Sequence, residues 1–182
     1  MTATESINPQ STMREVLEAF PGAQRGLFRK YHIGGCSSCA FSPSETLEQL
    51  CARNGYLNVS EMLDYIRTGH EDDAKILISP GELAEMRRQS PELPLLDVRT
   101  REEHEAVKIE GAVLMNQQSM QEMLSKWPRE RAFVIYDHTG KQGLDAAAYF
   151  LGHGFSNVRC LRGGIDAWAA EVDKEMPRYT LG

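Results

Sequence analysis

A short loop near position 140 has the residue types and the position needed to bind an anion. It follows an apolar run, residues 133–136, which predicts a strand, and it leads into a run with helical spacing. Where a strand end passes into a helix, backbone N–H groups and the helix dipole converge on one point and favour a negative charge there. The residues of this segment, called the 137–143 loop below, are Asp137, His138, Thr139, Gly140, Lys141, Gln142 and Gly143.

The residue at position 137 decides which chemistry this loop can perform. A cysteine there would be a thiolate of low pKa that attacks sulfur donors, and the same N–H groups would hold its persulfide. The carboxylate of Asp137 can fill the anion-binding position, but its oxygen cannot form or pass on a persulfide. We therefore interpret Asp137 as a carboxylate that caps the helix or occupies the anion-binding position, in a domain used for binding or packing.

Two sharper interpretations of the loop remain open. Asp137 as an aspartyl nucleophile would need a phosphoryl or acyl substrate and usually a metal, for which the sequence offers no second acidic cluster. His138 as a proton donor to a bound ligand competes with a merely polar role on a solvent-facing loop.

A pair of cysteines, Cys36 and Cys39, is the second candidate for chemistry. The pair follows Gly34-Gly35 and precedes a helix expected to begin after Ser42, which predicts a flexible junction. Cysteines separated by two residues can close a disulfide without long-range rearrangement, and ionisation of one thiol is coupled to the other. The spacing therefore predicts a redox-active or sulfur-carrying pair.

The same spacing is also half of a zinc or iron–sulfur site. Within one chain the complementary ligands are missing, and His32 and Cys51 are the additional candidates nearby. A homodimer that places two such pairs around one metal or cluster is one alternative, and a pair that only fills a turn is another. Cys51 and Cys160 lie among apolar residues, which predicts buried side chains with a raised pKa.

Composition limits the classes of partner. The chain of 182 residues is 41% hydrophobic, enough for one large or two small globular domains. A net charge of -6 argues against nucleic acid as a main partner. Four cysteines do not make a secreted disulfide framework, and we expect no secretory leader and no membrane span, hence a cytoplasmic protein.

The elements that position these residues fall into two halves. Residues 1–10 are expected to be disordered, and residues 11–68 carry apolar residues at helical spacing, which predicts a domain of four short helices. The expected boundaries are Thr12 with Glu15 before the first helix, Pro21-Gly22 after it, Gly34-Gly35 after the second, Ser42 with Pro43 at the third, and Asn58 with Glu61 at the fourth.

Residues 69–74 are polar and charged, which predicts a linker. From residue 75 to residue 182, short β-rich runs alternate with helical ones, and Ser79 with Glu82 predicts the start of the first helix. This alternation indicates an α/β domain with a parallel five-stranded sheet and helices on both faces. The expected strands are 75–78, 95–98, 112–115, 133–136 and 158–161.

Three stretches of the second half resemble the rhodanese-like family, whose members carry sulfane sulfur on a loop cysteine. The resemblance covers about residues 75–179, and it implies a small sulfur-containing anion or a protein thiol as partner. Three departures stand out: Asp137 replaces the cysteine, Gln142 and Gly143 stand where an arginine is usual, and Glu110 replaces a proline. The stretches are 95–99 with 102–104 and 109–112, then 133–143, then 161–168.

The segment from Tyr31 to Leu47, with its Gly-Gly-Cys-Ser-Ser-Cys core, resembles the hybrid-cluster-protein-associated redox disulfide family. The resemblance spans roughly residues 12–67, and it implies that Cys36 and Cys39 are the functional pair.

These observations together predict a two-domain protein. We expect a rhodanese-like module that lacks the usual catalytic cysteine and acts in binding or regulation in sulfur or redox metabolism, beside a helical domain with a redox-active Cys36 and Cys39. One alternative is a sulfurtransferase or thiol-disulfide enzyme that uses the same pair. Another is a zinc or iron–sulfur protein that assembles as a homodimer.

Overall fold

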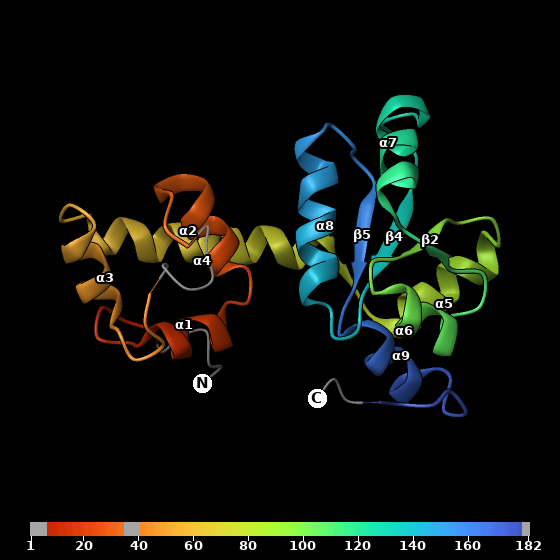
Figure 1. Ribbon diagram of the computed structural model, residues 1–182, viewed down its shortest axis with the longest axis horizontal. Coiled ribbons are helices and arrows are strands. Elements are labelled where there is room, and N and C mark those ends of the chain that lie inside the picture. The colour runs from red at the N-terminus through yellow and green to blue at the C-terminus, as the bar shows by residue number, and fades with distance from the viewer. Residues whose placement is uncertain (1–6, 35–40, 180–182) are drawn as a thin grey trace. The chain divides into compact units, whose positions relative to one another are not determined.

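The computed structural model describes residues 7–34 and 41–179 (Figure 1). Contacts between Cα atoms divide the chain into two compact units, Met1–Lys75 and Ile76–Gly182. Each unit has a hydrophobic core of its own. The two units are therefore described separately.

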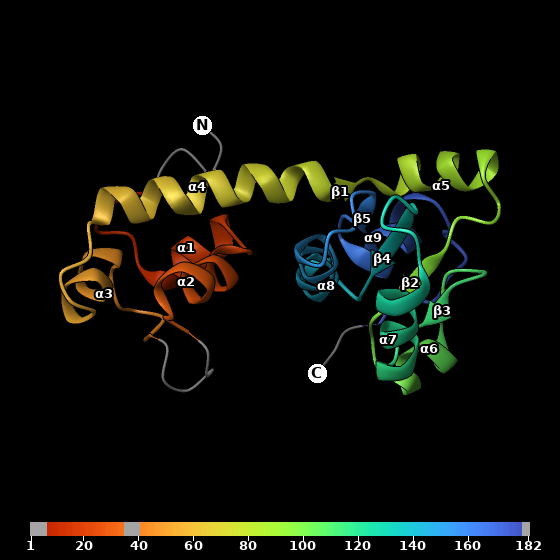
Figure 2. The ribbon, with the colours of Figure 1, turned by 90° about the horizontal axis from the view of Figure 1, so that it is seen from above.

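The first unit is helical, as predicted. In Figure 2, α1, α2 and α3 lie along one side of the long helix α4. Their apolar faces meet in one core, to which Val16, Leu27, Leu50 and Met62 contribute fully buried side chains. The helices are α1 (Met13–Ala19), α2 (Ala23–Tyr31), α3 (Leu47–Arg53) and α4 (Val59–Ile76).

Two of the predicted helix starts are confirmed by their capping contacts. Thr12 Oγ1 accepts from the backbone N–H of Glu15 at 3.3 Å, and the Glu15 carboxylate accepts from the N–H of Thr12 at 2.7 Å. Asn58 Oδ1 accepts from the N–H groups of Ser60 and Glu61 at 3.0 and 3.2 Å. These side chains satisfy donors that a helix start leaves without intrahelical partners.

The predicted start of the third helix at Ser42 is wrong. The helix α3 is capped at Thr46, which exchanges hydrogen bonds of 3.2 and 3.0 Å with Gln49. The residues before Thr46 instead pair with the start of α1, since Pro43 O accepts from the N–H of Arg14 at 3.0 Å. Local sequence does not reveal this pairing because its partner lies about thirty residues away.

The predicted linker, residues 69–74, is part of α4. Its side chains pack on the helical unit, where the carboxylate of Asp73 lies 2.5 Å from the guanidinium of Arg25 and the ring of His70 lies 5.1 Å from that of Phe20. These contacts make the segment a continued helix, although its composition is that of a loop.

The predicted disorder of residues 1–10 is wrong for the part that the structure describes. The side chain of Ile7 is buried in the helical core, and its carbonyl oxygen accepts from Arg67 Nη2 at 3.0 Å. Asn8 accepts from the N–H of Gln10 at 2.8 Å. Residues 1–6 lie outside the described residues.

The second unit contains the predicted five-stranded parallel sheet, in the order β1-β5-β4-β2-β3. All five predicted strands are present, with ends that differ by up to two residues. The strands are β1 (Leu77–Ile78), β2 (Leu95–Asp97), β3 (Val113–Leu114), β4 (Phe133–Tyr136) and β5 (Val158–Leu161).

Helices cover both faces of this sheet, as expected (Figures 1 and 2). Val134 and Tyr136 of the central strand β4 contribute to the core under α5 and α9, whereas Phe133 and Ile135 contribute to the core under α7 and α8. Such burial on both sides explains why β4 is an unbroken apolar run. The helices are α5 (Pro80–Gln89), α6 (Arg101–Ala106), α7 (Gln117–Lys126), α8 (Lys141–Gly152) and α9 (Gly164–Glu171).

The parallel register brings the segments after several strands to one edge of the sheet. Asp97 at the end of β2 pairs with Tyr136 at the end of β4, and Ile135 pairs with Cys160 in β5. The 137–143 loop therefore lies at the carboxyl edge, where open α/β sheets usually bind ligands. Among the described residues, no helix has both the length and the apolar character needed to cross a membrane.

Candidate functional site

The carboxylate of Asp137 occupies the anion-binding position of its own loop. Its Oδ1 accepts from the backbone N–H of Gly140 at 2.5 Å, and its Oδ2 accepts from that of Gln142 at 2.8 Å. Asp137 is 3% exposed. Gly140, with a φ of 92°, precedes the first residue of α8 and turns these N–H groups toward the carboxylate. The side chain at position 137 thus serves as an internal ligand of the helix start.

The start of α9 forms backbone hydrogen bonds with the loop. The carbonyl oxygens of Asp137 and His138 accept from the N–H groups of Ile165 and Asp166 at 2.9 and 3.1 Å. Gly164 has a φ of 60°, and a Cβ atom there would overlap the backbone of Asp137 and His138. Gly163 and Gly164 form the turn before α9, and this turn also fixes the loop.

A buried cluster of polar side chains around Asp97 lies next to the loop. The Asp97 carboxylate accepts from Arg99 Nε at 2.9 Å and Nη2 at 2.6 Å, from His104 Nδ1 at 2.8 Å and from Tyr136 Oη at 2.8 Å. The side chains of Asp97 and Arg99 are 0% and 1% exposed. Tyr136 is the residue before Asp137, so the cluster is connected directly to the loop.

The surroundings of Asp97 and Tyr136 shift the pKa of each. Burial raises the pKa of Asp97, but the hydrogen bonds from Arg99, His104 and Tyr136 outweigh burial and hold that pKa below its ordinary value. Burial and the adjacent carboxylate both raise the pKa of the Tyr136 phenol. The Asp97 carboxylate therefore joins Arg99, His104 and Tyr136 through hydrogen bonds within the fold.

Residues after α9 return to the loop. The hydroxyl of Tyr179 accepts from Arg99 Nη1 at 2.6 Å and donates to Glu103 Oε1 at 2.8 Å. Its ring centroid lies 4.4 Å from that of His138. The guanidinium of Arg178 binds the carboxylate of Asp166 at 2.8 and 2.9 Å. Tyr179 is not recognisable as a site residue from the sequence, because an isolated aromatic residue in an irregular segment carries no periodic signal.

The remaining loop residues present a mixed polar surface. His138 is half-buried, and its Nδ1 is a buried atom without a hydrogen-bond partner among the described residues. Thr139, Lys141 and Gln142 are exposed. Gly143 is buried, and a Cβ there would lie 3.3 Å from Asp137 Oδ1. Contact with another molecule would thus be made by the outer side chains of the loop.

The cysteines within the described residues are buried, as expected. Cys51 is 1% exposed with its Sγ 3.5 Å from Met62 Sδ, and burial raises the pKa of its thiol. Cys160 is 0% exposed and lies behind the loop, where a Cβ at Gly143 would lie 3.0 Å from its Sγ. Neither side chain is placed to act as a surface nucleophile.

The predicted pair Cys36 and Cys39 lies outside the described residues, so its redox or metal-binding role stays a prediction. His32, the nearby candidate ligand, is exposed at the end of α2 with a φ of 58°, and its ring lies 6.4 Å from that of Phe28. Across residues 7–34 and 41–179, no group of three or more His, Cys, Asp or Glu side chains is arranged to hold a metal ion.

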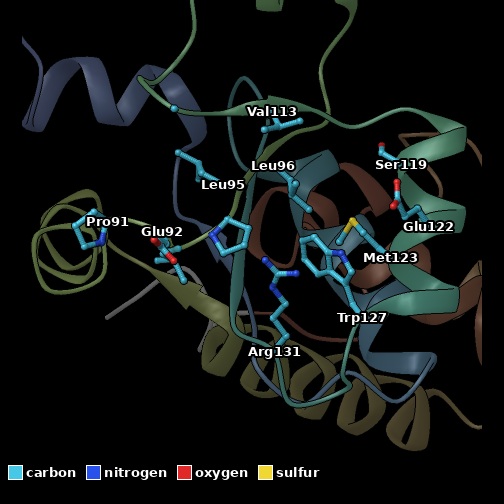
Figure 3. A pocket seen from close by; sticks show the side chains of 13 residues that line it. Pro91, Glu92, Leu95, Leu96, Val113, Ser119, Glu122, Met123, Trp127 and Arg131 are labelled. Carbon is cyan, nitrogen blue, oxygen red and sulfur yellow. The ribbon is translucent and has the colours of Figure 1, made fainter.

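A separate pocket lies near the opposite, amino edge of the sheet (Figure 3). Its volume is about 410 Å³, and its apolar lining includes Leu93, Leu96 and Met123. The guanidinium of Arg131 lies 3.9 Å from the ring of Trp127 at its side. Since Arg131 precedes β4 and the 137–143 loop follows it, the pocket and the loop lie at opposite ends of that strand.

Several curated relatives that match this chain carry the name sulfurtransferase. It is 36% identical over 104 residues to the probable adenylyltransferase/sulfurtransferase MoeZ of Mycobacterium tuberculosis, which is 56% of this chain and 26% of MoeZ. It is 32% identical over 92 residues to a sulfurtransferase of Allochromatium vinosum, which is 50% of this chain and 86% of that protein. The chain thus spans about a quarter of the length of MoeZ.

The comparison with solved structures finds the human single-domain sulfurtransferase TSTD1, with a TM-score of 0.47 and 25% identity over 53% of this chain and 96% of that one. The family model described as "Rhodanese-like domain" matches residues 79–171, which contain the sheet edge, the Asp97 cluster and the 137–143 loop. This chain therefore belongs to the rhodanese-like domain family.

Proposed function

We propose that this chain is a binding or regulatory module of sulfur or redox metabolism whose 137–143 loop serves recognition instead of sulfur transfer. The observation that carries this proposal is the pair of hydrogen bonds from Gly140 and Gln142 to the carboxylate of Asp137. The same N–H groups would have to stabilise a thiolate or persulfide in a sulfur-transferring loop.

The electrostatics of the loop support recognition of a partner other than a small anion. The buried carboxylate of Asp137 already uses the converging N–H groups, so a second anion would meet like charge at the same place. Gln142 adds no positive charge where the family resemblance leads one to expect an arginine. The exposed side chains of Thr139 and Lys141 are better placed to contact a protein, for which a thiol-bearing partner is our choice.

We assign the redox activity of the module to Cys36 and Cys39. The support is their spacing, the resemblance of the helical domain to a redox disulfide family, and the burial of both Cys51 and Cys160. A thiol pair on one domain and a recognition loop on the other would let one chain bind a partner and exchange electrons with it.

Thiocyanate formation from thiosulfate and cyanide tests the loss of sulfur transfer. The full chain is expected to form no thiocyanate above the rate in buffer. Formation that disappears in a Cys36→Ser/Cys39→Ser variant would replace our proposal by an enzyme that uses this pair. Formation that survives in that variant would contradict our interpretation of the loop itself.

Thiol titration tests the role of the pair. Under denaturing conditions, the oxidised full chain is expected to show two fewer reactive thiols than the reduced chain, and the Cys36→Ser/Cys39→Ser variant no difference. Equal counts for the oxidised and reduced chain would contradict a redox disulfide.

Elemental analysis of anaerobically purified protein tests the metal-binding alternative, which requires about one metal or cluster per dimer.

A further inference from the structure

The residues after α9 form a strap across the 137–143 loop. This segment, residues 176–179, is called the C-terminal strap below. Arg178 binds Asp166 in α9 through two hydrogen bonds of 2.8 and 2.9 Å. The ring of Tyr179 then lies against His138, the second residue of the loop. The strap therefore covers part of the surface that we propose for recognition.

The strap contacts the domain as a bound ligand would, through the guanidinium of Arg178 and the hydroxyl of Tyr179. The carboxylate of Asp166 matches the planar guanidinium of Arg178. The hydroxyl of Tyr179 accepts from Arg99 at 2.6 Å and donates to Glu103 at 2.8 Å. Arg178 thus binds a group of opposite charge, and the hydroxyl of Tyr179 has both a hydrogen-bond donor and an acceptor.

The attachment of the strap depends on side chains. Among the described residues, no backbone–backbone hydrogen bond joins residues 177–179 to the rest of the chain. The side chain of Arg178 is 56% exposed, and Tyr179 is half-buried. Segments with few buried contacts and no backbone pairing open most readily. Another molecule can therefore replace the strap without unfolding the sheet.

The strap is also an incomplete ligand. Next to the ring of Tyr179, the Nδ1 atom of His138 is buried without a hydrogen-bond partner among the described residues. Buried polar atoms of this kind lose the hydrogen bond they would make with water. A ligand that makes the same contacts as the strap and also pairs with this nitrogen would bind better than the strap does.

We propose that this face of the loop is a binding site for a protein segment carrying an arginine followed by a tyrosine, and that Arg178 and Tyr179 occupy it as a competing internal ligand. The inference rests on the proposed use of the loop for recognition, and it names the partner's chemistry. A tethered ligand acts at an effective concentration in the millimolar range, so the strap excludes weak competitors and yields to stronger ones.

The hydroxyl group should decide which segments bind. A site that places Arg99 and Glu103 around one hydroxyl leaves both groups without that partner when phenylalanine enters. Sites built to hydrogen-bond a hydroxyl discriminate strongly against the analogue that lacks it. The site therefore distinguishes tyrosine from phenylalanine in the binding segment.

The test uses the full chain with Tyr179→Ala and a synthetic peptide with the sequence of residues 172–182. Titration is followed by the NMR signals of His138 and the loop amides. We expect the peptide to bind the variant about tenfold or more tightly than the parent, in which the tethered strap competes. A peptide with phenylalanine in place of tyrosine should bind the variant about tenfold more weakly.

The matched control is Lys174→Ala, which changes an exposed residue just before the strap and should leave peptide binding as in the parent. Equal affinity for parent and Tyr179→Ala, equal binding of the two peptides, or no binding at millimolar peptide would each overturn the inference. If Tyr179→Ala does not fold, Tyr179→Phe takes its place, because it keeps the ring contact with His138. Thiocyanate formation would overturn the proposed function while leaving these binding results unaffected.

Discussion

The carboxylate of Asp137 makes the contacts that a thiolate would need at the same position. It accepts from the N–H groups of Gly140 and Gln142, and it is almost completely shielded from water. The loop therefore keeps the geometry of an anion-binding helix start, and the loss of persulfide chemistry at its central residue is our proposal.

Asp137→Cys, made in a Cys36→Ser/Cys39→Ser background, should create a thiol of low pKa. The two N–H groups that now bind the carboxylate would stabilise the thiolate, so its pKa should fall from about 8.5 into the range of about 3.5 to 7.5. The rate of iodoacetamide alkylation as a function of pH measures this pKa.

The background variant without the new cysteine is the control, and its buried Cys51 and Cys160 should react slowly. An ordinary pKa for the thiol at position 137 would show that the N–H groups do not converge on this position.

Asp97→Asn should destabilise the second unit and change its response to acid. Removing one partner of a buried ion pair leaves Arg99 without its counter-charge, at a cost of about 3 to 5 kcal/mol. Since the folded pKa of Asp97 lies below its reference value of 3.8, its contribution is fully present above that pH and is lost as the pH falls through the folded pKa.

Urea unfolding of parent and variant at pH 7 and at several values below pH 4 checks both effects. The parent should lose more stability on acidification than Asp97→Asn does. The same acid dependence in both proteins would show that Asp97 is not the group responsible.

At the scale of elements, local signals predicted most of the architecture. The capping contacts of Thr12, Asn58 and Ser79 occur where the sequence placed them, because a cap depends on residues within three positions of one another. The start of α3 and the helical state of residues 69–74 were missed, because they depend on contacts between distant segments.

The candidate site was predicted in part for the same reason. The strand-loop-helix order revealed the 137–143 loop and the position of Asp137. The support from Gly164 and the covering contact from Tyr179 come from segments more than twenty residues further along the chain. Such contacts follow from the packing of α9 against the loop, which periodicity does not encode.

Gly164→Ala should displace the loop and destabilise the second unit by at least about 2 kcal/mol. Its φ of 60° disfavours a side chain, and the added Cβ would overlap the backbone of the loop. Gly81→Ala in α5 is the matched control, because open space surrounds that position. Urea unfolding and the NMR shifts of the loop amides measure the two effects, and equal behaviour of the variants would contradict the packing described for Gly164.

At the scale of the whole molecule, the chain combines two units, each with a core of its own. The family model covers residues 79–171 in the second unit alone. The predicted redox pair Cys36 and Cys39 belongs to the part of the sequence that the family model does not match.

Gly69→Ala tests whether α4 is continuous through residues 69–74. Alanine in an exposed helix interior should raise the stability of the helical unit by about 1 kcal/mol, and Gly69 has open space for the added methyl group. Urea unfolding followed by circular dichroism measures the change. Unchanged or lower stability would favour the linker predicted from composition.

Mass spectrometry of the reduced full chain after treatment with thiosulfate, with peptide mapping of each cysteine, tests most directly whether this chain transfers sulfur. We expect no added sulfur on Cys51 or Cys160, both buried, and no transfer of sulfur to cyanide from any cysteine. A persulfide that forms on a cysteine of this chain and is turned over by cyanide would contradict the proposal that the chain recognises its partner without transferring sulfur.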